Sequence, residues 1–188
     1  MKTDASNPSE STLREFDADL PPAAPGGRVF CGDLDMRIDR DGTWFHEGTA
    51  IERHELVCLF ASVLIRDADG THWLVTPGEV GRVAVDDAPF LAVELFRARE
   101  GRDQILSVRT NVEQMFPVDK DHPIRIEFDP ETGEPAPYVG IHRRMEARLS
   151  RAVYYELVDL GTEETVNHEA VYGVWSHDQF FALGPVEA

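Results

Sequence analysis

The stretch Asp33-Leu34-Asp35-Met36-Arg37-Ile38-Asp39, followed by Asp41-Gly42, decides how the ordered part of this chain begins. Apolar and charged residues alternate along it, and a period of two predicts a half-buried antiparallel strand. Asp-Gly is a strong signal for a tight hairpin, because the turn needs positive φ angles. We therefore expect residues 43–46 to return as a second strand.

A helix is predicted directly after this hairpin. Thr49 and Glu52 have the spacing of a capping box, in which each side chain satisfies a backbone donor at the start of a helix. The apolar residues that follow have helical spacing and would form one stripe. They are Leu56, Leu59, Phe60, Val63 and Leu64. Beyond the helix, apolar runs between Gly and Pro turns predict strands at 72–76, 81–85 and 90–97.

The second half of the chain repeats this order of elements. Residues 124–129 alternate as residues 33–39 do, residues 137–143 form an extended return, and Ser150 is placed to cap a second helix that Gly161 ends. Further strands are expected at 104–110, 170–176 and 179–183. The shared order favours an internal duplication, but the residue identity between the halves is slight, so a duplicated and an unrelated pair of domains both stay open.

This pattern predicts an α+β fold made of two related sheet-plus-helix domains. Hairpins interrupted by single helices are typical of this class, and the sequence does not show the alternation of strand and helix that a doubly wound parallel sheet requires. Residues 1–27 are rich in Ser, Pro, Ala and acidic residues and are expected to form a disordered acidic tail. The N-terminal domain is expected at 28–86 and the C-terminal domain at 87–188.

Composition narrows the classes of partner. The chain has 188 residues, of which 42% are hydrophobic, and this is enough for a packed core. It carries 35 Asp and Glu against 18 Lys and Arg, a formal net charge of −17. Such an excess repels phosphate backbones and anionic lipid headgroups, so we expect neither nucleic acid nor a membrane as partner.

Cysteine use and hydropathy favour a cytoplasmic protein. The chain has two cysteines, Cys31 and Cys58, fewer than a small secreted scaffold needs for its disulfides. Its first residues lack the apolar stretch of a secretory signal. The longest apolar run, residues 56–65, is about half the length of a membrane span.

No motif for catalysis or metal binding is present in the sequence. An EF-hand loop built around Gly42 or Gly70 would begin with Arg37 or Ile65, neither of which is a calcium ligand. The seven histidines include no helical pair of the zinc-protease type, and there is no Cys-x-x-Cys or Gly-x-Ser-x-Gly motif. The sequence therefore predicts no metal and no cofactor, and it favours a binding protein over an enzyme.

A basic cluster stands out from the acidic background. Because guanidinium groups bind phosphate and carboxylate groups with two hydrogen bonds, Arg143 and Arg151 are our candidates for binding an anionic ligand, with Arg53 from the first half opposite them. Trp44 and Tyr154 lie near turns and element starts, where a ring could stack on them. The alternative is that the arginines pair with the abundant acids on a solvated face and that the aromatic residues are core.

Five segments in a fixed order carry a family resemblance: Phe30-Cys31-Gly32-Asp33-Leu34-Asp35-Met36-Arg37-Ile38, Asp41-Gly42-Thr43-Trp44-Phe45, Leu74-Val75-Thr76-Pro77, Asp87-Ala88-Pro89-Phe90, and Gly173-Val174-Trp175-Ser176 with Phe180-Phe181. They resemble the bacterial family called domain of unknown function 1285, over about residues 28–184. The resemblance implies two related α+β domains, the second loosely similar to pleckstrin-homology-like barrels. It also implies a groove between the domains for a small, nucleotide-like ligand and a part in signalling, and it brings no catalytic motif.

Three functions follow as hypotheses. The first is a cytoplasmic module that binds a small anionic molecule between its two domains, where sites commonly form. The second is a hydrolase that uses Asp33 and Asp35 as paired carboxylates, because two close carboxylates can raise the pKa of one of them. The third is a protein-interaction module, which an exposed apolar patch would support.

Overall fold

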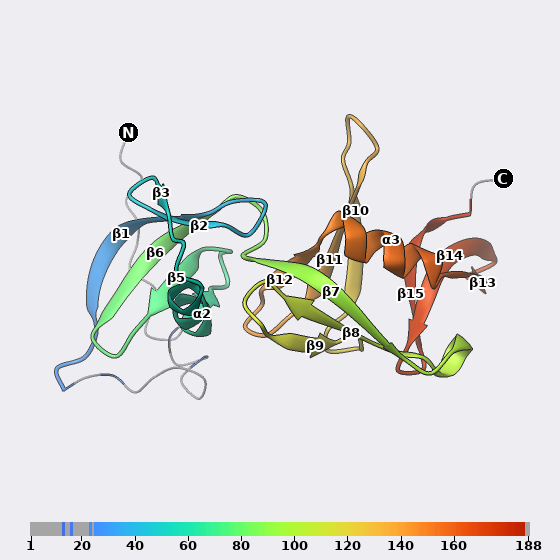
Figure 1. Cartoon of the computed structure of the whole chain (residues 1–188), viewed down its shortest axis with the longest axis horizontal. Helices are drawn as coiled ribbons and strands as arrows, with labels where there is room; N and C mark the ends of the chain where they lie inside the picture. Colours follow the sequence, from blue (N-terminus) through green and yellow to red (C-terminus); the bar gives the residue numbers. More distant parts are fainter. Residues whose placement is uncertain (1–12, 14–15, 17–22, 24, 187–188) are drawn as a thin grey trace. The chain divides into compact units, whose positions relative to one another are not determined.

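The computed structural model describes residues 13, 16, 23 and 25–186, and it divides into two compact units (Figure 1). Unit 1 is the chain up to Pro89 together with Arg143–Met145, and unit 2 comprises Phe90–His142 and the residues from Glu146 onward. The expected two-domain organisation is confirmed. Each unit is built mostly from sheet, with one α-helix of nine residues among its described residues.

Unit 1 is a single mixed sheet with one helix. Its elements are β1 (Val29–Ile38), β2 (Trp44–His46), β3 (Thr49–Ala50), α2 (His54–Ser62), β4 (Leu64–Arg66), β5 (His72–Val75) and β6 (Glu79–Val85). The strand order is β3-β2-β1-β6-β5-β4. The predicted hairpin is confirmed, with β1 antiparallel to β2, but β1 also pairs in parallel with β6. Local alternation in the sequence does not reveal this second partner.

The capping-box prediction at Thr49 was wrong. Thr49 and Ala50 pair with β2 as the short strand β3, so their backbone groups take part in a sheet. The helix starts only at His54, after an N-cap residue, Arg53, whose side chain makes no capping hydrogen bond. It ends at Ser62, and the last residue of the predicted apolar stripe, Leu64, lies in β4.

The core of unit 1 lies between α2 and the sheet. Ile38 and Trp44 are buried with 0% and 1% of their surface exposed, and Phe60 of α2 stacks on Trp44 at 6.2 Å between ring centroids. A second cluster contains Trp73 and its neighbours, and Phe16 packs into it with 6% of its surface exposed. Phe16 falls in the segment that we expected to be a disordered tail, but it is part of this core. Most of residues 1–27 lie outside the described residues.

The described part of unit 2 has two sheets, one α-helix and one short 3-10 helix. Its elements are β7 (Phe90–Ala98), the 3-10 helix η1 (Gly101–Asp103), β8 (Ile105–Thr110), β9 (Met115–Pro117), β10 (Ile124–Phe128), β11 (Pro135–Gly140), β12 (Glu146–Leu149), α3 (Arg151–Asp159), β13 (Thr162–Val166), β14 (Glu169–Ser176) and β15 (Gln179–Pro185). The first sheet has the order β10-β11-β12-β7-β8-β9, and the second has the order β13-β14-β15. The sequence did not predict the strands β9, β12 and β13.

The two six-stranded sheets have the same topology. In each, the first strand is central and the next two run outward to one edge, while the fourth to sixth strands return from the opposite edge to the centre. The first and sixth strands form the one parallel pair, β1 with β6 and β7 with β12, and all other pairs are antiparallel. By topology β7 is therefore the counterpart of β1, whereas the sequence comparison aligned β1 with the strand that is now β10.

The segment after β12 has no counterpart in unit 1. It consists of α3 and the three-stranded sheet, in which α3 packs against β7, β12 and β14, and β15 lies against β10. The predicted cap of this helix is confirmed, because the Ser150 hydroxyl accepts a hydrogen bond from the backbone amide of Val153. None of the described helices is long and apolar enough to cross a membrane.

Candidate functional site

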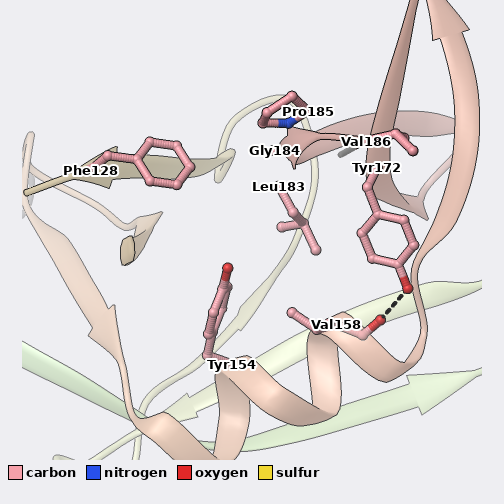
Figure 2. A pocket seen from close by; sticks show the side chains of 8 residues that line it. All are labelled: Phe128, Tyr154, Val158, Tyr172, Leu183, Gly184, Pro185 and Val186. Carbon is pink, nitrogen blue, oxygen red and sulfur yellow. Dashed lines mark hydrogen bonds between the residues drawn. The ribbon is translucent and has the colours of Figure 1, made fainter. Parts of the chain in front are cut away.

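A pocket of about 400 Å³ opens in unit 2 (Figure 2). Its lining residues come from four elements: Phe128 from β10, Tyr154 and Val158 from α3, Tyr172 from β14, and Leu183, Gly184 and Pro185 from β15, followed by Val186. None of these side chains is charged. The pocket is therefore an apolar hollow whose polar side-chain groups are two tyrosine hydroxyls.

The amphipathic pattern of α3 turns one side of the helix toward the pocket. Val153 and Leu157 are buried, with 1% and 0% of their surface exposed. Tyr154 and Val158 follow them by one residue each and are four residues apart, so they lie on the same neighbouring face. The cap at Ser150 sets where the helix begins and hence which side chains reach this face.

The Tyr154 hydroxyl points into the pocket (Figure 2). Within the described part of the chain it makes no hydrogen bond. Burial raises the pKa of Tyr154, and the neighbouring Tyr155 adds to this rise. The phenol therefore keeps its proton at neutral pH and can donate a hydrogen bond to a group inside the pocket.

Tyr172 forms the opposite end of the pocket and is held in place from two sides. Its hydroxyl donates a hydrogen bond of 2.8 Å to the backbone carbonyl of Val158 (Figure 2). Gly161 lies against its ring, and a Cβ there would come within 2.4 Å of the ring. The Tyr172 hydroxyl thus already donates its hydrogen bond within the protein, which leaves the Tyr154 hydroxyl as the donor for a ligand.

The mouth of the pocket is partly aromatic. Phe128 has 52% of its surface exposed, whereas Leu183 at the back has 4%. A Cβ on Gly184 would lie 3.8 Å from the Phe128 ring, an ordinary contact distance. The absence of a side chain at Gly184 therefore leaves space between β10 and β15.

Two of the five predicted ligand-binding residues lie together on α3. Arg151 is the first residue of the helix, three positions before Tyr154, so both lie on one side of it. Arg151 is exposed, and none of the described residues forms an ion pair with it. The pair predicted from the sequence, a cation and a stacking ring, is thus adjacent in the structure.

The other three predicted residues belong to unit 1. Arg53 is exposed at the start of α2. Trp44 is buried and stacked on Phe60, so it has the core role given as the alternative. A common site between the domains for all five residues stays a prediction.

Arg143 differs most from its expected role. Its guanidinium group donates hydrogen bonds to the backbone carbonyls of Ser62, the last residue of α2, at 2.7 Å, and of Leu64, the first residue of β4, at 3.1 Å. A cation is favourable there, because the last carbonyls of a helix carry partial negative charge. Arg143 and Arg144 both have positive φ angles, and this turn brings the guanidinium group to the carbonyls. The group is held by the protein itself, which argues against the anion-binding role.

The carboxylates proposed for hydrolysis are on the exposed side of β1. Asp33 forms an ion pair of 2.8 Å with Arg82 on the neighbouring strand. Asp35 has a positive φ angle and lies at a register shift between β1 and β6. No group of three or more potential metal ligands occurs among the described residues.

The sequence did not single out the partners of Tyr154 in the pocket. Phe128 was expected only as one apolar position of an alternating strand and Tyr172 as part of a closing strand, and Gly184 lies one residue beyond the closing strand expected at 179–183. These residues are 56 positions or fewer apart in the chain but on separate elements, and no local pattern brings them together. The one signal in the sequence for this pocket was Phe128, an aromatic residue at the end of β10.

Comparisons with known proteins agree with the two-unit structure. A family model described as the N-terminal domain of DUF1285, a domain of unknown function, matches residues 21–88, and a second, described as the C-terminal domain of DUF1285, a protein of unknown function, matches residues 89–183. No curated protein matches the chain.

Two solved structures are similar to the chain. A DUF1285 family protein from Silicibacter pomeroyi DSS-3 is 41% identical, with a TM-score of 0.78, and the match covers 95% of this chain and 97% of that one. A DUF1285 family protein from Shewanella baltica OS155 is 30% identical, with a TM-score of 0.54, and the match covers 68% of this chain and 91% of that one. With both domain models and the 41% identical structure in agreement, the chain belongs to the DUF1285 family.

Proposed function

We propose that this protein binds a small molecule and that the pocket of unit 2 is its binding site. The observation that carries the proposal is the Tyr154 hydroxyl, which points into an apolar pocket without a hydrogen-bond partner among the described residues. Tyr154 is half-buried, so a ligand in the pocket can replace solvent at this hydroxyl and accept its hydrogen bond.

The size and construction of the pocket support this function. Ligand pockets are typically about 300–1,000 Å³ and are mostly apolar with a few placed polar groups. The unit 2 pocket has about 400 Å³ and is lined from a helix and three strands. Three of those elements, α3, β14 and β15, follow the six-stranded sheet and have no counterpart in unit 1. This addition to the repeated sheet topology is what creates the pocket.

The proposal keeps the small-molecule function expected from the sequence and moves the site to one domain. Of the residues expected to bind, it retains Arg151 and Tyr154. The hydrolase and protein-interaction hypotheses, the pleckstrin-like character of the second domain, the cytoplasmic location and the signalling role stay predictions.

Binding of a neutral apolar probe tests the pocket. N-phenyl-1-naphthylamine becomes fluorescent in apolar sites, and we expect saturable binding to the full-length protein. Tyr154→Ala removes a wall of the pocket, and Gly184→Val adds side-chain atoms beside Phe128, so each should weaken binding at least fivefold. Tyr155→Ala is the matched control, because Tyr155 is the adjacent residue on α3, is 63% exposed and does not line the pocket.

Circular dichroism and thermal unfolding should show that all three variants are folded. Equal probe affinity for the wild-type protein, Tyr154→Ala and Gly184→Val would place any bound probe elsewhere and refute the proposed site. An effect of Tyr155→Ala as large as that of Tyr154→Ala would refute it as well.

A further inference from the structure

Resting on this proposed function, we infer the chemical class of the ligand: a small ring-containing carboxylic acid. Its ring occupies the unit 2 pocket, and its carboxylate lies on the α3 side, where it accepts hydrogen bonds from the Tyr154 hydroxyl and the Arg151 guanidinium group.

The lining of the pocket favours a ligand whose buried part is uncharged and apolar. Six of its eight lining residues have purely hydrocarbon side chains or none, and the hydroxyl of Tyr172 is already used by the carbonyl of Val158. A charge placed against this lining would lose its hydration without gaining a partner. A ring, in contrast, can pack against the exposed face of Phe128 and against Tyr154.

Arg151 is not one of the lining residues, but it precedes the lining residue Tyr154 by one turn of α3. Arg151 and Tyr154 are three residues apart on α3, a spacing that places their Cβ atoms about 5–6 Å apart. A carboxylate has two oxygens, so one can accept from the phenol and the other from the guanidinium group. Because burial raises the pKa of Tyr154, this phenol stays a donor across the physiological range.

A second, independent observation supports a carboxylate ligand: Arg151 forms no ion pair with any of the described residues. In a chain with 35 acidic and 18 basic residues, an arginine has many potential partners, but none of the described residues pairs with Arg151. The acid nearest to Phe128 in sequence on β10 is Glu127, which pairs with Arg125 and points to the other face of the strand. The charge of Arg151 is therefore available to an anion beside Tyr154.

A pair of probes that differ only in charge tests the inference. We would titrate the full-length protein with 2-naphthoate and with its neutral counterpart 2-naphthamide and measure affinity by isothermal titration calorimetry. We expect the acid to bind about five- to tenfold more tightly, the effect of one partly exposed charge-assisted hydrogen bond. Arg151→Gln should abolish this preference, so that the acid and the amide bind with similar affinity.

Controls separate this inference from the proposed site. Arg97→Gln removes an exposed arginine of β7 that does not line the pocket and should leave both affinities unchanged, whereas Tyr154→Phe should weaken both probes. Equal binding of the acid and the amide, with both sensitive to Tyr154→Ala, would overturn the carboxylate assignment and keep the pocket. Binding of neither probe, or binding of both that Tyr154→Ala does not affect, would overturn the pocket and the assignment together.

Discussion

His72 should make the stability of unit 1 fall as the solution becomes acidic. It lies in β5 with 9% of its surface exposed, directly opposite Arg66 of β4, and its Nε2 atom has no hydrogen-bond partner among the described residues. The pKa of His72 is lowered from 6.5 to about 4, chiefly by burial and also by the positive charge of Arg66, while Asp67 opposes the change.

The sign and size follow from linkage between protonation and folding. Because the pKa in the folded protein is below the unfolded value of 6.5, the unfolded chain binds a proton that the folded chain excludes between these values. The contribution of neutral His72 is therefore fully present above pH 6.5 and is lost as the pH falls toward 4. With 1.36 kcal/mol per pKa unit, the loss is about 2 kcal/mol at pH 5 and about 3 kcal/mol below pH 4.

Urea unfolding at pH 8 and pH 5 measures this effect, with tryptophan fluorescence reporting on Trp44 and Trp73 of unit 1 together with Trp175 of unit 2. Carboxylates also titrate, so the informative quantity is the difference between wild type and His72→Gln. The variant should lose about 2 kcal/mol less than wild type between the two pH values. His168→Gln, at an exposed position, is the matched control and should behave as wild type. If His72→Gln and wild type lose the same free energy, the imidazole does not titrate as its burial implies.

Three further predictions concern single contacts. Arg143→Gln removes a cation from the carbonyls of Ser62 at the end of α2 and Leu64 at the start of β4, and it should destabilise unit 1 by about 1–3 kcal/mol in urea unfolding. An unchanged midpoint would mean that the contact contributes nothing. Gly161→Ala forces a methyl group against the Tyr172 ring, so it should lower the melting temperature and weaken binding of N-phenyl-1-naphthylamine; a variant with wild-type values would show that the ring moves freely. Asp67→Asn leaves the indole N–H of Trp73 with a weaker acceptor. It should shift the tryptophan emission maximum and lower the free energy of unfolding by about 1–2 kcal/mol. Emission spectra identical to those of wild type would contradict this account.

Local signals in the sequence were reliable where the partner groups are local. The Ser150 cap predicted the start of α3 because its acceptor and donor are three residues apart. Asp39 accepts hydrogen bonds from the amides of Asp41 and Thr43, and the hairpin that Asp41-Gly42 predicted forms there. In both cases a few neighbouring residues satisfy their own hydrogen bonds.

Signals failed where another partner competed for the same residue, whether that partner was near or far in the chain. Thr49 and Glu52 match a capping box, but Thr49 lies in β3 and pairs with His46 of β2, and the helix starts later. Arg143 has the chemistry of an anion-binding residue, and a turn of two residues with positive φ angles directs it to the end of α2. A side chain's chemistry was evident from the sequence, whereas its partner depended on chain segments about 80 residues away.

The sequence alone determined the two-domain organisation, the hairpins and the start of the second helix, because all of these depend on composition and on spacings of a few residues, and it placed Arg151 and Tyr154 among the residues predicted to bind a ligand. Only the tertiary structure decided the central parallel pairs, the shared topology of the two sheets and the pocket in unit 2. The physical reason is that a parallel pair and a pocket both form from segments that are far apart in the chain, and no local pattern specifies which of many apolar strands will meet.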